Sequence, residues 1–164
     1  MIKDDYTKSI NPVIGISPIY LILGTIPGQE SLKQRQYYAH PRNSFWKIIF
    51  KIFNYNFTKS YSEQINFIKE NQIALWDVCF TCYRKGSLDS NIKEEIPNKI
   101  PKLLENNSTI SNIIFNGTTA EKLFKKHFKY LENKKYFTAL STSPANASYS
   151  FEQKLKNWKV GFLI

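Results

Sequence analysis

Four short apolar runs divide the chain, and each is followed by a glycine or a polar residue. Continuous apolar character over four or five residues is typical of strands that are covered on both faces. A polar or turn-forming residue then marks the point where each strand ends. We therefore expect buried strands at Tyr20–Leu23, Ile73–Trp76, Asn112–Phe115 and Tyr136–Leu140.

The segments between these runs follow the helical period. In Ser44–Phe53, apolar residues recur three and four positions apart and so share one helix face. Two further segments open with the spacing of a capping box, Ser60 with Glu63 and Thr118 with Glu121. The predicted helices are Ser44–Phe53, Tyr61–Glu70, Pro97–Leu104, Thr119–Phe128 and Phe151–Trp158.

Strands that alternate with helices favour βαβ units, in which right-handed crossovers join parallel strands. The predicted fold class is α/β, a three-layer α/β/α sandwich around a central parallel sheet of about four strands. A length of 164 residues suits a single domain with one substantial core. We expect one domain over residues 1–164, with residues 1–17 as a peripheral N-terminal extension.

The charge of the chain indicates a polyanionic partner. Its 23 basic and 13 acidic residues give a net charge of +10. This excess favours a nucleic-acid partner, bound through its phosphates, over a surface that is basic only for solubility. No apolar run approaches the ~18 residues of a membrane span, and the N-terminus lacks the apolar core of a signal peptide. We expect an intracellular, cytoplasmic protein that associates with nucleic acid and not with membranes.

The two cysteines, Cys79 and Cys82, are spaced as C-x-x-C. A structural zinc ion or an iron–sulfur cluster needs four ligands, and the two histidines, His40 and His127, have no paired spacing. The intervening Phe80-Thr81 lacks the context of a redox motif. We therefore predict structural thiols in or after a buried strand, with no metal and no cofactor.

Polar clusters follow all four predicted strands, and the carboxyl ends of parallel strands meet at one rim of a sheet. The turn Gly24–Gly28 is neither a phosphate-binding loop nor a dinucleotide fingerprint. The expected pocket contains amides, hydroxyls, aromatic rings and an imidazole. Such a pocket suits an uncharged base held by hydrogen bonds and stacking, and it can orient a water molecule.

Two of these segments resemble a known family. Gly24-Thr25-Ile26-Pro27-Gly28 and Tyr37–Trp46 resemble the uracil-DNA glycosylase superfamily, most closely its hypoxanthine-DNA (deoxyinosine) glycosylase branch. Pro41–Trp46 is also similar to the matching segment of mismatch-specific uracil/thymine glycosylases. The stretches Ala74–Cys79, Gly86–Ser90 and Ser141–Ala147 agree with this branch, and the resemblance covers about residues 19–160.

The resemblance implies a monofunctional hydrolase that cleaves the N-glycosidic bond of a deaminated base in base-excision repair. Hypoxanthine is the first expected base and uracil the second. The base lies in double-stranded or single-stranded DNA and must be flipped out of the stack. We expect a monomer.

Asn43 is the catalytic candidate, because it matches the asparagine associated with catalysis in the deoxyinosine branch. An amide positions a water molecule but is a poor general base. The alternative is that Asn43 only caps the following helix. Thr25 and Ile26 depart from the uracil branches, which often carry Asp or Asn in this turn, and neither can activate water in that way.

The remaining candidates form two groups. The residues expected around the base are Gly24, Thr25, Ile26, Pro27, Gly28, Tyr38, His40, Phe45 and Asn116. The residues expected to contact DNA are Arg42, Ser141, Ser143, Pro144, Ala145 and Asn146. The alternatives are an ordinary Asn-Gly turn at Asn116, a structural role for His40, core positions for the aromatic residues, and a plain surface loop at 141–146.

Two other hypotheses remain open. One is a binding module that holds lesions or single strands by charge and stacking without cleaving them, since no strong general base is evident. The other is a small-molecule or redox enzyme that uses Cys79 and Cys82, which we rank last.

Overall fold

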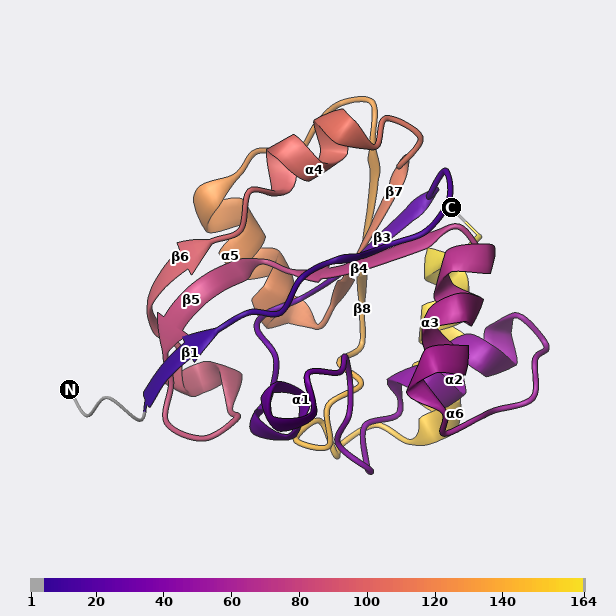
Figure 1. Ribbon diagram of the computed structural model, residues 1–164, viewed down its shortest axis with the longest axis horizontal. Helices are drawn as coiled ribbons and strands as arrows, with labels where there is room; N and C mark the ends of the chain where they lie inside the picture. Colours follow the sequence, from indigo (N-terminus) through magenta and orange to yellow (C-terminus); the bar gives the residue numbers. More distant parts are fainter. Residues whose placement is uncertain (1–4, 164) are drawn as a thin grey trace.

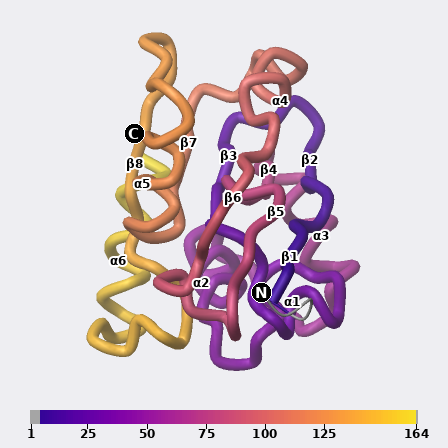
Figure 2. The backbone as a smooth tube through the Cα atoms, turned by 90° about the vertical axis from the view of Figure 1, so that its left-hand side faces the viewer, coloured from indigo at the N-terminus to yellow at the C-terminus, as the bar shows by residue number. Residues whose placement is uncertain are grey.

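The computed structural model describes residues 5–163 and contains a central five-stranded sheet with helices on its two faces (Figure 1). The strand order is β2-β4-β3-β7-β8, and the tube in Figure 2 shows these strands side by side. Strands β4, β3, β7 and β8 are parallel, and the short β2 pairs antiparallel with β4 at the edge. The bounds are β2 (Val13–Ile14), β3 (Tyr20–Gly24), β4 (Ile73–Asp77), β7 (Asn112–Asn116) and β8 (Lys135–Ala139).

The four predicted strands lie within one residue of their expected bounds, because continuous apolar runs identify strands that are covered on both faces. The antiparallel edge strand β2 was not predicted. It has only two residues and too short a pattern to be recognised.

A second, three-stranded antiparallel sheet was also not predicted. It comprises β1 (Tyr6–Lys8), β5 (Cys79–Tyr83) and β6 (Lys93–Pro97), in the order β1-β5-β6. Only Val78 separates β5 from β4. The charged start of β6, Lys93-Glu94-Glu95, lies at a sheet edge, where charged side chains are tolerated but give no apolar signal.

The second sheet shortens one predicted helix, and it includes a strand from the N-terminal part of the chain. Pro97 ends β6, so the helix expected from Pro97 begins instead at Ile100. Residues 1–17, expected to be a peripheral extension, carry the edge strands β1 and β2, and Ile10 and Val13 pack against the core. Residues 1–4 lie outside the described part of the chain.

The helices cover the central sheet from both sides. Helices α2 (Phe45–Ile52), α3 (Tyr61–Glu70) and α6 (Phe151–Gly161) pack on the face that carries Ile22 and Leu75. Helices α4 (Ile100–Asn106) and α5 (Thr118–His127) pack on the face that carries Leu21 and Leu23 (Figure 1). The short α1 (Gln29–Gln34) and a 3-10 turn, η2 (Asp89–Asn91), follow β3 and β5.

The helix starts show which capping predictions hold. Ser60 accepts a hydrogen bond from the backbone N–H of Glu63, but the predicted box is only half formed, because Ser60 N–H donates to the Thr58 hydroxyl and not to Glu63. The box predicted at Thr118 is wrong, because Gly117 is the N-cap and Glu121 pairs with Lys125 instead. A complete capping box stands at the start of α6, where Ser150 and Gln153 bond reciprocally. None of the helices within residues 5–163 is long and apolar enough to cross a membrane.

Candidate functional site

A cleft of about 800 Å³ lies at the carboxyl ends of β3, β4, β7 and β8. The residues that follow all four predicted strands line it, as expected from the convergence of parallel strands. Further walls come from α1, the segment before α2, and the loop between β5 and η2. The main lining segments are 24–31, 37–38, 87–89, 116–119 and 138–146, together with His40, Asn43, Asp77 and Tyr149.

The Gly24–Gly28 turn forms the floor of the cleft and is held from below. The buried guanidinium of Arg84 donates hydrogen bonds to the carbonyl oxygens of Ile26 and Pro27. The carbonyl of Gly24 accepts from Val78 N–H at 2.9 Å. These bonds join the turn to β5 and its loop, so the second sheet fixes the floor of the cleft.

Gly24 leaves a space in this floor that no other residue could leave. A Cβ atom there would lie 2.7 Å from Oδ1 of Asp77 and 3.4 Å from the hydroxyl of Tyr38. The first distance is shorter than a van der Waals contact. The two polar groups therefore meet at the backbone of Gly24, which stands opposite Asp77 in the β3–β4 register.

Asp77 is a buried carboxyl group in the wall of the cleft. Burial raises its pKa to about 7, and the charge of Asp89 adds to this, while a hydrogen bond from Ser9 and the charge of Arg84 oppose it. The hydroxyl of Ser9 donates to Oδ2 at 3.3 Å. A carboxyl group with this pKa is protonated to a large extent near neutral pH and can donate a hydrogen bond.

Tyr38 presents a second polar atom to the same space. Its backbone has φ +55°, a left-handed conformation that is uncommon outside glycine. Its ring stacks on Phe45 with centroids 3.9 Å apart, and burial raises the pKa of its hydroxyl. That hydroxyl is buried and makes no hydrogen bond of regular geometry among residues 5–163, although the nearby Asn116 side chain opposes the rise of its pKa. An unpartnered buried donor beside a cleft marks a place where a ligand can accept.

Phe45 does not line the cleft, which corrects its predicted place around the base. It is fully buried and packs between Tyr38 and the core residues Trp46 and Trp158. The helical spacing that places Phe45 on the apolar face of α2 also directs its side chain inward, toward the sheet. Phe45 supports the ring of Tyr38 from behind.

Asn43 lines the cleft at the start of α2. Its side-chain oxygen accepts from Phe45 N–H at 3.0 Å, so it does help to cap this helix. Its side-chain nitrogen makes no hydrogen bond to another residue in the described range. The cap therefore fixes the amide group and directs its remaining hydrogen-bonding capacity to the cleft.

His40 also lines the cleft but is exposed at its rim. Its Nδ1 accepts from the backbone N–H of Arg42 at 3.1 Å, which leaves Nε2 to carry the proton of the neutral ring. Arg42, predicted to contact DNA, is exposed and lies outside the lining of the cleft. It stands on the surface next to the rim.

Asn116 lines the cleft, and its side chain is bonded to the opposite wall. Its oxygen accepts from Thr142 N–H at 2.9 Å, and its nitrogen donates to the Thr142 hydroxyl at 2.9 Å. Gly117 has φ +96°, and a Cβ atom at this position would lie only 3.1 Å from the Ser141 Cβ, so glycine allows the turn to pack closely on Ser141. The two hydrogen bonds between Asn116 and Thr142 hold the end of β7 and the 141–146 loop together.

The 141–146 loop is rigidified by its own side chains. The hydroxyl of Ser141 accepts from Ser143 N–H, and that of Ser143 accepts from Ala145 N–H, each at 3.2 Å. The side chain of Asn146 donates back to the carbonyl of Ser141 at 3.1 Å. All five predicted DNA-contacting residues of this loop line the cleft. Ser44 N–H also donates to Thr142 O at 3.1 Å, so the loop is tied to the start of α2.

Sequence reasoning missed part of the site. Asp77 was noted only as a polar residue at a strand end, and Asp89, Ser87 and Leu88 were not considered as cleft residues. The Thr25 hydroxyl donates to Asp89 at 2.7 Å, and Gln29 N–H donates to the Ser87 hydroxyl at 2.9 Å. The only sequence signal for this loop was the similarity of Gly86–Ser90 to the family.

The two cysteines are free thiols, buried in β5, as predicted for structural thiols. Burial raises the pKa of Cys79 to about 12, which keeps the unreactive thiol form at neutral pH. Within residues 5–163, His, Cys, Asp and Glu side chains form no group of three that could hold a metal ion.

Comparison with known proteins identifies the family of this chain. Residues 13–162 match the family described as the uracil DNA glycosylase superfamily. A hypoxanthine DNA glycosylase of Methanosarcina barkeri is 36% identical over 107 residues, which cover 65% of this chain and 68% of the relative. A protein of the same name from Methanosarcina acetivorans is 32% identical over 144 residues, 87% of this chain and 89% of the relative.

A solved structure has the same fold. The solution NMR structure of a Methanosarcina acetivorans protein, proposed there to be a uracil DNA glycosylase, aligns with a TM-score of 0.80 and 30% identity. The alignment covers 94% of this chain and 95% of that chain.

Proposed function

The chain belongs to the uracil DNA glycosylase superfamily, and from this premise we propose that this DNA glycosylase removes hypoxanthine, with uracil as a second substrate, from DNA in base-excision repair. The deaminated base is flipped into the cleft, and its N-glycosidic bond is hydrolysed. The enzyme is monofunctional and leaves an abasic site.

One observation carries the proposal beyond the family. The unpartnered hydroxyl of Tyr38 and the buried carboxyl of Asp77 approach the same point beside Gly24. As the glycosidic bond breaks, negative charge develops on the leaving base. Donors that point to that charge stabilise the transition state, and their effect is large where water is excluded.

Asp77 and Tyr38 divide this task in our proposal. The protonated carboxyl of Asp77 donates its proton to a ring nitrogen of the departing base, and the Tyr38 hydroxyl donates a hydrogen bond. An ionised Asp77 would oppose departure, because a carboxylate repels an anionic leaving group. The neighbouring Arg84 and Ser9 favour this ionised form, but burial outweighs them and raises the pKa of Asp77 to about 7.

Asn43 holds the attacking water molecule in the proposed mechanism. The bond from Phe45 N–H fixes the amide group. The amide then positions the water against C1′ of the sugar as the C1′–N bond breaks, and the excess proton of the water leaves to solvent. This suits the cationic character of the sugar, which needs a nucleophile in place more than a strong base.

DNA is held by the rim of the cleft. The hydroxyls of Ser141 and Ser143, which accept hydrogen bonds within the loop and can still donate, contact phosphate as such groups do in protein–DNA complexes. Two large apolar side chains stand exposed at the cleft, Leu88 at 52% and Tyr149 at 45%. They can fill the space that the flipped base leaves in the stack.

The test is an alkaline-cleavage assay on labelled duplexes that each carry one hypoxanthine, uracil, xanthine or mismatched thymine, with a chelator present. We expect cleavage at hypoxanthine to exceed cleavage at the other bases. Cleavage at uracil alone would keep the glycosylase and refute the assigned base. DNA binding by the folded protein without cleavage at any base would favour the non-catalytic binding module.

A further inference from the structure

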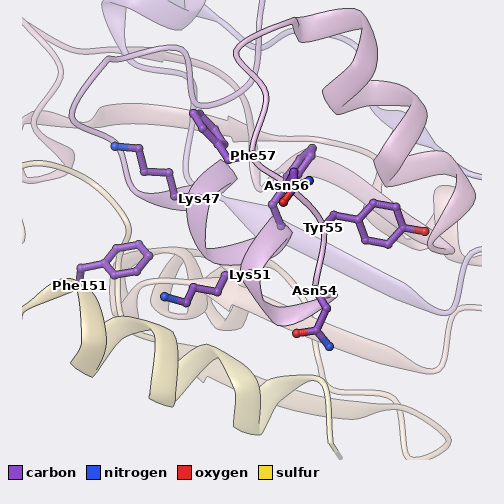
Figure 3. Close-up of a pocket in the computed structure, with 8 residues that line it drawn as sticks. Lys47, Lys51, Asn54, Tyr55, Asn56, Phe57 and Phe151 are labelled. Atoms are coloured by element: carbon purple, nitrogen blue, oxygen red, sulfur yellow. The ribbon is translucent and has the colours of Figure 1, made fainter.

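A second concave surface lies beside α2, away from the floor of the cleft (Figure 3). We name it the α2 groove. It has a volume of about 470 Å³ and comprises Lys47, Phe50, Lys51, Asn54, Tyr55, Asn56, Phe57 and Phe151. Figure 3 shows that Lys47 and Lys51 extend to the side of α2 where Phe151 lies, whereas Tyr55 points away.

The two lysines of this groove are not used within the protein. Both are exposed, and neither forms an ion pair with a carboxylate among residues 5–163. The acidic side chain nearest in sequence to the groove is that of the exposed Glu152, which forms no such pair either. Two unpaired cations on one helix face repel each other, so an anion between them is favoured.

Aromatic rings hold these lysines in place. The ammonium group of Lys47 lies 5.8 Å from the ring centre of Phe57, and that of Lys51 lies 6.0 Å from the ring centre of Phe151. Such contacts restrict long side chains while the charges stay accessible to solvent. The arrangement reduces the entropy lost when the lysines bind an anion.

The two elements that form the α2 groove follow along the chain from segments that line the cleft. Asn43 precedes α2, which carries Lys47 and Lys51. The 141–146 loop precedes Phe151 at the start of α6. The N–H and the hydroxyl of Ser44 both donate to Thr142 O, so the start of α2 is tied to the 141–146 loop.

We propose that the α2 groove binds the sugar–phosphate backbone of the DNA strand that flanks the flipped nucleotide, with phosphates on Lys47 and Lys51. This inference rests on the proposed function, because it takes the DNA path from the cleft. Helix geometry places Lys51 about 9 Å beyond Phe45 along the axis. That length corresponds to about three phosphates of one strand of a duplex.

The experiment measures DNA binding by Lys47→Ala/Lys51→Ala as a function of salt. The plot of the logarithm of the DNA-binding constant against the logarithm of salt concentration has a negative slope. Two lost phosphate contacts should reduce the magnitude of this slope by about 2. Lys99→Ala/Lys102→Ala is the matched control, since it removes the same charge from the α4 side of the sheet. Lys47→Arg/Lys51→Arg keeps the charge and should keep the slope.

Substrate length gives a second measurement. Duplexes carry hypoxanthine with a long arm on both sides, or with one arm cut to two base pairs on the 5′ or the 3′ side. We expect the unsubstituted protein to bind more weakly when one particular arm is cut, and the alanine variant to lose that difference. The arm concerned gives the polarity of the strand in the groove.

The proposal is overturned if the alanine variant keeps the slope and the arm dependence of the unsubstituted protein, or if the control variant changes them equally. Excision by the unsubstituted protein at saturating DNA tests the proposed function separately. A groove that binds no DNA therefore cannot be confused with a protein that is not a glycosylase.

Discussion

The cleft and the α2 groove are both lined by polar and aromatic side chains, but they are built differently. The cleft draws its residues from segments scattered between Gly24 and Tyr149, and several of its polar side chains, among them Thr25, Asp77 and Asn116, are buried and hydrogen-bonded to other residues. All but one residue of the groove lies in 47–57, and its cations are exposed. In our proposals the cleft holds groups at fixed places for chemistry, and the groove attracts the charge of the DNA.

The difference predicts how substitutions act. A change in the cleft alters the free energy of the transition state, because each group has a fixed place around the reacting bond. A change in the groove alters the affinity for DNA and its salt dependence, because exposed charges are screened and replaceable. The following predictions separate these two behaviours, from the largest expected effect to the smallest.

The largest effect is expected for Asn43→Ala. Loss of the group that positions water should lower single-turnover excision of hypoxanthine by roughly 10²–10³-fold. Asn43→Ser is the matched control, because serine can still accept from Phe45 N–H and cap α2. If the serine variant recovers full excision, the amide has only a capping role and the assignment of Asn43 fails.

Asp77→Asn should lower excision by about 10²-fold at pH 6, since general acid catalysis contributes roughly this much. Because burial raises the pKa of Asp77 to about 7, the unsubstituted enzyme should lose activity as the pH rises through this value. The asparagine variant cannot ionise and should show no such decline. A pH–rate profile in single-turnover conditions checks both statements, and equal profiles would exclude Asp77 as the acid.

The same carboxyl should affect stability in a defined pH window. Its pKa is raised in the folded state, so the native protein holds a proton that the unfolded chain releases between about pH 4 and pH 7. Stability therefore falls across this window as the pH rises, by up to about 4 kcal/mol. Asp77→Asn should be the more stable protein at pH 8 and have no such advantage at pH 4, as measured by denaturant unfolding.

Tyr38→Phe should separate activity from stability. Loss of the hydroxyl should lower excision about tenfold or more, because one donor to the leaving base is removed. Stability should stay equal or rise, since a buried hydroxyl without a partner is costly. Tyr37→Phe should behave in the opposite way, because the Tyr37 hydroxyl donates to Asn11 O at 2.8 Å. Thermal unfolding and single-turnover assays on both variants decide this.

The smallest effect is expected for Arg42→Ala, at the boundary between the cleft and the groove. Arg42 is exposed beside the rim, so its removal should cost one phosphate contact and lower the salt slope of DNA binding by about 1. A change in the pH profile of excision would instead assign Arg42 to the chemistry. Binding isotherms at several salt concentrations provide the measurement.

Much of the frame was predictable from local pattern. The apolar run at Ile73–Trp76 is a strand because nothing polar interrupts it, and the repeat of apolar residues in α2 gives its buried face. The β5 strand escaped prediction because Thr81 interrupts its short apolar pattern, and β6 because it is charged and largely exposed; the two owe their pairing to each other. Their absence from the prediction hid the loop that carries Leu88 and Asp89.

The sequence alone determined the parallel strands, the helices between them and the convergence of polar residues at one rim, because these follow from periodicity over a few residues. Only the tertiary structure decided which side chains face one another. It turned Phe45 inward, bound Asn116 to Thr142, and brought Tyr38 to Asp77 across the glycine of β3. Such pairs join residues far apart along the chain, and packing in three dimensions sets their distances, which no local pattern encodes.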